Sequence, residues 1–213
     1  MKRLSTKKKL ALCLLILLAA AVMFFSVLGW KSPTAEVAFR RLEKRQLVGP
    51  AQILGTEQIN CNYYNHMIIG ASEYGYTAFA WYDSTNWDHG DLNYFPKQED
   101  ITLFLPLDLY VITGIKDAWL PVVVFAEDDS AVQARLTLQL DSEIITVEAA
   151  RTFSGYFLFR LNGDVASYDF VIQLLRTLSP NYVTNDTATA SITFFDRSGS
   201  ELATYTPAIL FPD

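Results

Sequence analysis

The chain has 213 residues, of which 51% are hydrophobic and 14% aromatic, and its formal net charge is −6. Residues 1–48 carry ten basic and two acidic side chains, a net +8, whereas residues 49–213 carry seven basic and 21 acidic ones, a net −14. A chain this apolar is not intrinsically disordered. The acidic body also excludes a nucleic-acid binder, because such a protein carries its positive charge on the folded domain.

The N-terminal segment predicts a single-pass membrane anchor. Residues 10–28, from Leu10 to Leu28, contain no charged side chain, and a helix of this length spans about 28 Å, close to the thickness of a bilayer core. Trp30 follows at the position of the far interface. Residues 1–9 form a basic tail with five cations, namely Lys2, Arg3, Lys7, Lys8 and Lys9. By the positive-inside rule the N-terminus is cytoplasmic and the C-terminus extracytoplasmic.

A cleavable signal peptide is the alternative to this signal-anchor. Cleavage near Gly29 would secrete the remaining chain, but the apolar run exceeds the roughly 7–15 residues of a usual signal sequence. Beyond the anchor only Cys61 remains, so no disulfide is expected in the exported part. An exported domain without disulfides favours the surface of a bacterial cell.

Residues 31–48 predict a basic juxtamembrane helix. Ser32 or Thr34 can cap its start, and the pair Gly49-Pro50 ends it. Two interpretations of this helix remain open. In the first, its basic side chains contact anionic lipid headgroups or wall polymer. In the second, the helix is solvated and packs back against the acidic body.

The rest of the chain predicts a mainly β protein. Residues 51–110 form an aromatic-rich small β region, with strands expected at 67–71, 76–81, 92–95 and 101–105. Residues 115–213 form an antiparallel β-sandwich domain of immunoglobulin-like size, with strands expected at 119–126, 132–140, 144–150, 155–161, 188–195 and 201–205. One connecting helix is expected between Ser167 and Ser179. Whether residues 51–110 form a separate sheet or extend the sandwich stays open.

The loop over residues 83–91 is the strongest candidate for a ligand site. Tyr82 and Trp87 border it and are expected to be exposed aromatic contacts for a ligand or protein partner. The loop also supplies four oxygen-bearing side chains, those of Asp83, Asn86, Asp88 and Asp91. Calcium binding is one interpretation of this spacing, although the EF-hand pattern does not fit. A polar hairpin loop is the other, and no cofactor is expected.

The sequence contains no identifiable catalytic constellation. Cys61 could act as a nucleophile only with a histidine beside it, and a structural cysteine is the favoured interpretation. We therefore expect a non-enzymatic, membrane-tethered binding module that contacts the lipid bilayer and a protein partner with a cationic surface. Two alternatives are a wall-glycan hydrolase with an unidentified carboxylate pair and an accessory subunit of a membrane complex.

Overall fold

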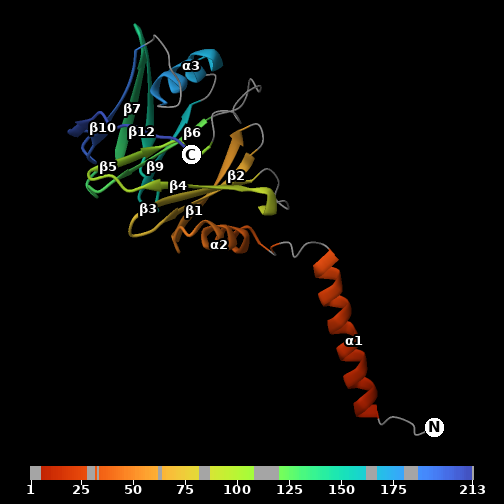
Figure 1. Ribbon diagram of the computed structural model, residues 1–213. Helices are drawn as coiled ribbons and strands as arrows, with labels where there is room; N and C mark the ends of the chain where they lie inside the picture. The colour runs from red at the N-terminus through yellow and green to blue at the C-terminus, as the bar shows by residue number, and fades with distance from the viewer. Residues whose placement is uncertain are drawn as a thin grey trace.

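The chain is described by a computed structural model in which an isolated N-terminal helix precedes a folded β body (Figure 1). The described residues are 6–27, 32, 34–61, 64–81, 87–107, 120–161, 167–179 and 187–212. Lys2, Arg3, Leu28 and Trp30, which belong to the predicted anchor and its flanks, lie outside these ranges, and so does the side chain of Lys8.

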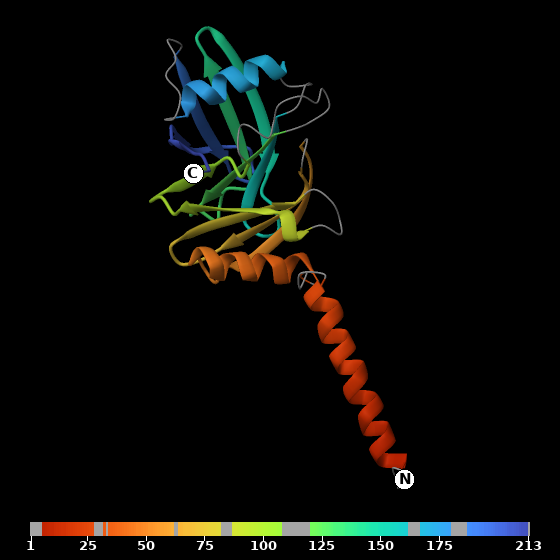
Figure 2. The same ribbon diagram turned by 45° about the vertical axis from the view of Figure 1, so that its right-hand side comes forward.

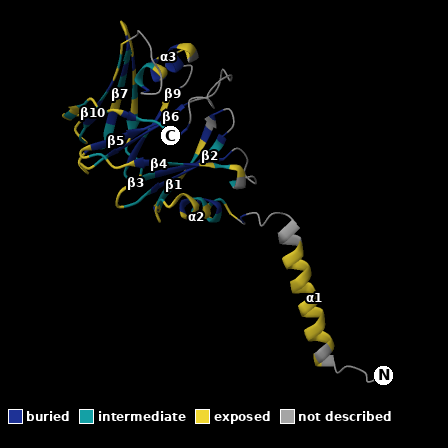
Figure 3. Cartoon of the chain, in the orientation of Figure 1, coloured by how far each residue is buried: buried dark blue, intermediate teal, exposed yellow. Residues whose placement is uncertain are grey.

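Helix α1 spans Thr6–Val27 and lies apart from the body in two views (Figures 1 and 2). Its described side chains from Leu10 to Met23 are exposed on all sides (Figure 3). A helix over the predicted apolar run is therefore present. Within the described residues, no helix meets the length and hydropathy needed to cross a membrane.

Helix α2, Ala35–Gln46, is the predicted basic helix and lies against the body. The hydroxyl of Thr34 caps it by accepting a hydrogen bond from the backbone N–H of Val37 at 3.2 Å. Leu47 ends the helix in a left-handed conformation, with φ of 59°. Ala38 and Phe39 are buried against the neighbouring sheet, so α2 packs back onto the acidic body.

The first sheet is a four-stranded antiparallel meander that packs against α2, and its strand order is β1-β2-β3-β4. Its strands are β1 Gln52–Cys61, β2 Tyr64–Ala71, β3 Gly75–Trp81 and β4 Asp91–Pro96. Phe79 and Trp81 point toward α2, whereas Ala78 and Ala80 join the main core on the other face. Because both faces are covered, most aromatic residues of this region serve as core. The strands expected at 67–71 and 76–81 are present and pair as an antiparallel hairpin.

The second sheet lies in the middle of the body, in the order β12-β5-β6-β9. Its strands are β5 Ile101–Phe104, β6 Leu120–Ala126, β9 Tyr156–Leu161 and β12 Ile209–Leu210. Phe125 stacks on Tyr76 of the first sheet with ring centroids 3.8 Å apart. On the opposite face Phe157 contacts Phe194 of the third sheet. The short strand β12, which the sequence does not predict, pairs in parallel with β5.

The third sheet has the order β11-β10-β7-β8 and carries helix α3. Its elements are β7 Gln133–Leu140, β8 Glu143–Ala150, α3 Tyr168–Leu178, β10 Ala188–Phe195 and β11 Glu201–Tyr205. Ser167 caps α3 as predicted, with the backbone N–H of Phe170 donating to its hydroxyl at 3.3 Å. The apolar face of α3, which includes Leu174 and Leu175, packs on β7 and β10.

The mainly β, antiparallel class is confirmed, and packed sheets of this kind are consistent with a β-sandwich. The described strands form three sheets where the sequence suggested one sandwich and one small region. β5, from residues 51–110, pairs with β6 from the following region. One hydrophobic cluster contains buried side chains from both regions, among them Met67 and Leu136.

Candidate functional site

A polar cavity of about 540 Å³ lies between the C-terminal end of α2 and the start of β4. Arg45 and Gln46 of α2 line one side, and Asp91 and Asn93 of β4 line another. The remaining lining residues include Tyr64 from β2 and Pro212 from the C-terminal segment. Segments that are far apart in the sequence thus meet at this cavity.

Tyr64 and Asp91 form the polar centre of the cavity. The buried Tyr64 donates its phenolic O–H to Oδ2 of the exposed Asp91. This hydrogen bond holds the carboxylate on a defined side of the cavity. Asn93, next on the same side of β4, donates from Nδ2 to the carbonyl oxygen of Pro106 at 3.0 Å and so ties the strand to the chain beyond β5.

The lining groups determine which ligands the cavity suits. Asp91 contributes negative charge, and Arg45, exposed on α2, contributes positive charge. The amide of Gln46 and the phenol of Tyr64 add neutral hydrogen-bonding groups. Such a lining favours a small polar group of the ligand, such as an ammonium or amide, over an apolar one.

Trp87, whose carbonyl accepts a hydrogen bond from Gly90 of the cavity lining, is not the exposed aromatic contact expected from the sequence. It belongs to the short 3-10 helix η1, Trp87–His89, and is partly buried against the cluster that contains Phe79 and Trp81. Its indole N–H donates to the carbonyl oxygen of Ser32 at 2.6 Å. The expectation of a freely exposed Trp87 is therefore corrected. η1 packs on α2, and Ser32, just before that helix, accepts the hydrogen bond of the indole N–H.

The other predicted ligand residues are only partly described. Asp91 lies at the cavity, whereas Tyr82, Asp83 and Asn86 fall outside the described residues, as does the side chain of Asp88. Across the part of the chain that is described, no group of three or more His, Cys, Asp or Glu side chains could hold a metal ion. The calcium interpretation of the loop stays a prediction.

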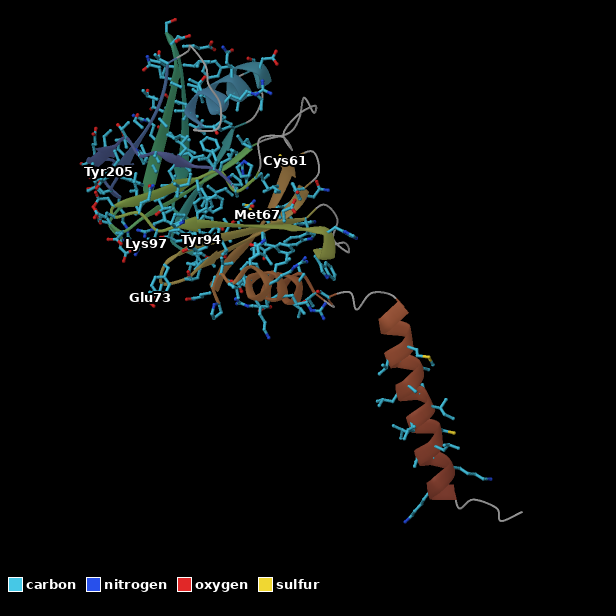
Figure 4. All side chains as sticks on the ribbon, viewed as in Figure 1. Cys61, Met67, Glu73, Tyr94, Lys97 and Tyr205 are labelled. Carbon is cyan, nitrogen blue, oxygen red and sulfur yellow. The ribbon has the colours of Figure 1, made fainter. Side chains whose placement is uncertain are left out.

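Cys61 ends β1 inside the main core (Figure 4). Its thiol is fully buried, and this burial raises its pKa from 9.0 to about 12. At neutral pH the thiol is protonated and so lacks the thiolate that a nucleophile needs. Of the two histidines, His66 stacks on Trp81 with centroids 5.4 Å apart, and His89 is exposed.

A second buried polar contact joins the first two sheets. Tyr156 of β9 is buried and donates its O–H to Oε1 of Glu57 in β1. Burial and then the neighbouring carboxylate raise the pKa of Tyr156 well above its usual range. Gly55 permits this contact, because a Cβ at that position would lie 2.9 Å from the Tyr156 hydroxyl. The contact fixes the position of β9 against β1.

Sequence reasoning identified Asp91 but missed Tyr64, Arg45 and Asn93 as its neighbours. In the sequence, Tyr64 is one of many aromatic residues in region 51–110, and Arg45 is one of several cations in the basic helix over residues 31–48. Their meeting depends on where α2 docks across the sheet, which no local pattern encodes. A pairing of β2 with β3, and of β3 with β4, is the step that places Tyr64 near Asp91.

Comparison with known proteins adds no residue roles. No protein-family model matches the chain, and no curated protein matches it. The roles considered for Asp91, Tyr64 and Arg45 therefore come from their geometry.

Proposed function

We propose that the chain is a membrane-tethered, non-enzymatic binding module with its folded body outside the cytoplasm. The observation that carries the proposal is the exposed apolar surface of α1. Leu12, Leu17 and Leu18 are 54%, 70% and 66% exposed, although their spacing places them on different sides of the helix. A helix that is apolar all round is stable when a core or a bilayer surrounds it, and the folded body does not cover α1.

The sequence around α1 indicates that a lipid bilayer, and not a protein core, surrounds this helix. The described apolar side chains run to Met23, and the sequence continues without a charge to Leu28. The five basic residues before the run favour a cytoplasmic N-terminus. The location that fits is the cell membrane of a bacterium, crossed once, with the C-terminal body on the outer side.

The cavity at Asp91 and Tyr64 is the proposed binding site of the body. Its rim carries both charge signs, and the body as a whole carries a net −14, which attracts cationic partners over long range. The Asp91 carboxylate, oriented by Tyr64, then pairs with a basic group of that partner. The protonated state of buried Cys61 supports a binding role over a covalent one.

Site-specific photo-crosslinking tests the binding site. A benzophenone amino acid replaces Gln46 at the cavity rim of the full chain in its native membrane, and a control chain carries it at Leu202 of β11. Gln46 lines the cavity and Leu202, also exposed, does not. The proposal predicts an adduct from position 46 alone, and its loss in the Asp91→Asn variant at unchanged thermal stability.

Equal adducts from both positions, or adducts that persist in Asp91→Asn, would contradict the assignment of the site. The non-enzymatic part has its own control. Purified full chain is incubated with cell-wall glycan, and soluble fragments are measured. Release of fragments that depends on the folded chain would favour a hydrolase over the binding module.

A further inference from the structure

The outward face of α2 combines positive charge with one exposed apolar side chain. We define this basic face as Arg41, Lys44 and Arg45 together with Leu47. All four side chains are exposed, and Leu47 reaches 91%. In the part of the chain that the structure describes, no salt bridge joins Lys44 or Arg45 to an acid. Arg40, by contrast, pairs with Glu43 at 2.8 Å on the packed side of the helix.

The basic face is close to the proposed anchor. α1 ends at Val27 and α2 begins at Ala35, so seven residues join them. An extended chain of seven residues spans at most about 25 Å. Figures 1 and 2 both show α2 on the side of the body nearest α1. If α1 crosses a bilayer, α2 is confined to the zone directly above the headgroups.

The distribution of charge gives the body a preferred orientation in that zone. Residues 31–48 carry a net +3, and residues 49–213 a net −14. An anionic membrane surface attracts the first segment and repels the second within roughly a Debye length, about 8–10 Å. Since α2 covers one face of the first sheet, both effects favour the orientation in which α2 faces the bilayer and the rest of the body points away.

We propose that the basic face of α2 binds the anionic lipid headgroups of the membrane that holds α1. Lys44 and Arg45 contact the phosphates, and the side chain of Leu47 enters the interfacial layer. Arg41, which donates to the Ser32 hydroxyl at 3.1 Å, adds positive charge beside them. This inference rests on the proposed membrane anchor and adds a fixed orientation of the body. Arg45 also lines the cavity at Asp91, so that cavity lies at the height of the headgroups.

An environment-sensitive fluorophore on residue 47 tests the contact. Full chain carrying Cys13→Ser and Leu47→Cys is labelled with the NBD fluorophore, since the buried Cys61 does not react in the folded state. The protein is reconstituted in nanodiscs of phosphatidylcholine, with or without phosphatidylglycerol. The proposal predicts brighter, blue-shifted NBD emission in the anionic discs only. A Leu202→Cys label on β11 shows no difference between discs.

Charge reversal at one residue identifies the basic face as the cause. Lys44→Glu changes the charge by two, and each basic side chain near an anionic surface contributes about fivefold in affinity, so the contact weakens roughly 25-fold. The matched control is Arg197→Glu, at an exposed turn position between β10 and β11. It leaves the emission of the label at residue 47 unchanged. High salt reproduces the effect of Lys44→Glu.

The outcomes separate the anchor from the orientation. If the chain does not insert into nanodiscs at all, the proposed membrane anchor is refuted. Chain that enters them but gives the same NBD emission in neutral and anionic discs overturns the headgroup contact alone. Soluble polyphosphate is added to chain in neutral discs as a further arm. If it changes the emission as anionic lipid does, the basic face recognises a free polyanion, and the lipid assignment is wrong.

Discussion

The carboxylate of Glu43 accepts a hydrogen bond from the backbone N–H of Ala51 at 2.8 Å. Its other oxygen pairs with Arg40 at 2.8 Å, and the side chain is almost completely buried. This contact joins the last turn of α2 to the residue before β1. It therefore fixes how α2 lies over the first sheet, and with it the wall of the cavity that contains Arg45 and Gln46.

Glu43→Ala is expected to lower the free energy of unfolding by about 2–3 kcal/mol, because the Ala51 N–H loses its buried acceptor. Glu43→Gln retains an amide oxygen and should cost about 1 kcal/mol. The neighbouring exposed residue supplies the control, since Lys44→Ala should change stability by less than about 0.5 kcal/mol. Urea unfolding of detergent-solubilised full chain, followed by tryptophan fluorescence, measures all three. Equal losses for Glu43→Ala and Lys44→Ala would refute the role of the contact.

Gly49 faces the same carboxylate and should not tolerate a side chain. Its φ is +91°, and a Cβ there would lie 2.7 Å from Oε1 of Glu43. Gly49→Ala is expected to cost about 3 kcal/mol, from left-handed strain and the displaced carboxylate together. Gly199 has a φ of +80° with no atom within 4 Å of its Cβ position, so Gly199→Ala should cost only about 1–2 kcal/mol. Similar losses in the two variants would show that the Glu43 contact adds nothing.

Alkaline pH should destabilise the fold through Cys61. Burial raises the pKa of this thiol from 9.0 to about 12 in the folded state, so the unfolded chain loses its proton first. The stability that the neutral thiol provides is complete below pH 9 and falls as the pH rises from 9 towards 12, by at most about 1.4 kcal/mol per pH unit. Urea unfolding between pH 8 and pH 10 should show this decline in Cys13→Ser chain. Cys61→Val should flatten it, and an unchanged slope in that variant would rule out Cys61 as its source.

The hydroxyl of Tyr156 should stabilise the contact between the first two sheets. Tyr156→Phe removes the O–H that donates to Glu57, at an expected cost of about 1–2 kcal/mol, since Glu57 is only half-buried. Tyr205→Phe on β11 is the matched control and should cost less than about 0.5 kcal/mol. Thermal unfolding by circular dichroism compares the two, and the idea fails if both variants melt together with the parent.

Periodic patterns predicted several elements of the fold well. The strand expected at 132–140 and the helix expected between Ser167 and Ser179 both match described elements, β7 and α3. β1 was missed because bulges after Ile53 and after Gln58 interrupt its alternation of buried and exposed side chains. β12 was missed because two residues carry no period at all.

The candidate site was harder to predict than the strands. Asp91 could be predicted because it belongs to a local run of oxygen-bearing side chains in one polar loop, which the sequence shows directly. Tyr64 and Arg45 became its neighbours only through the register of three strands and the docking of α2. The expectation for Trp87 was wrong for the same reason, since the surface that buries its ring comes from another part of the chain. The positions of Tyr64, Arg45 and Trp87 all depend on tertiary packing, which no local sequence pattern predicts.

Alkaline extraction combined with protease accessibility tests the proposed membrane anchor and its topology. Membranes from cells that express full chain with an N-terminal and a C-terminal epitope are washed with alkaline carbonate. Intact cells stripped of their wall are treated with protease in parallel. We expect full-length chain in the membrane pellet, a C-terminal epitope that external protease destroys and an N-terminal epitope that survives until the membrane is permeabilised. Full-length chain released by carbonate would refute the membrane anchor, and a C-terminal epitope that is protected in intact cells would refute the extracytoplasmic body.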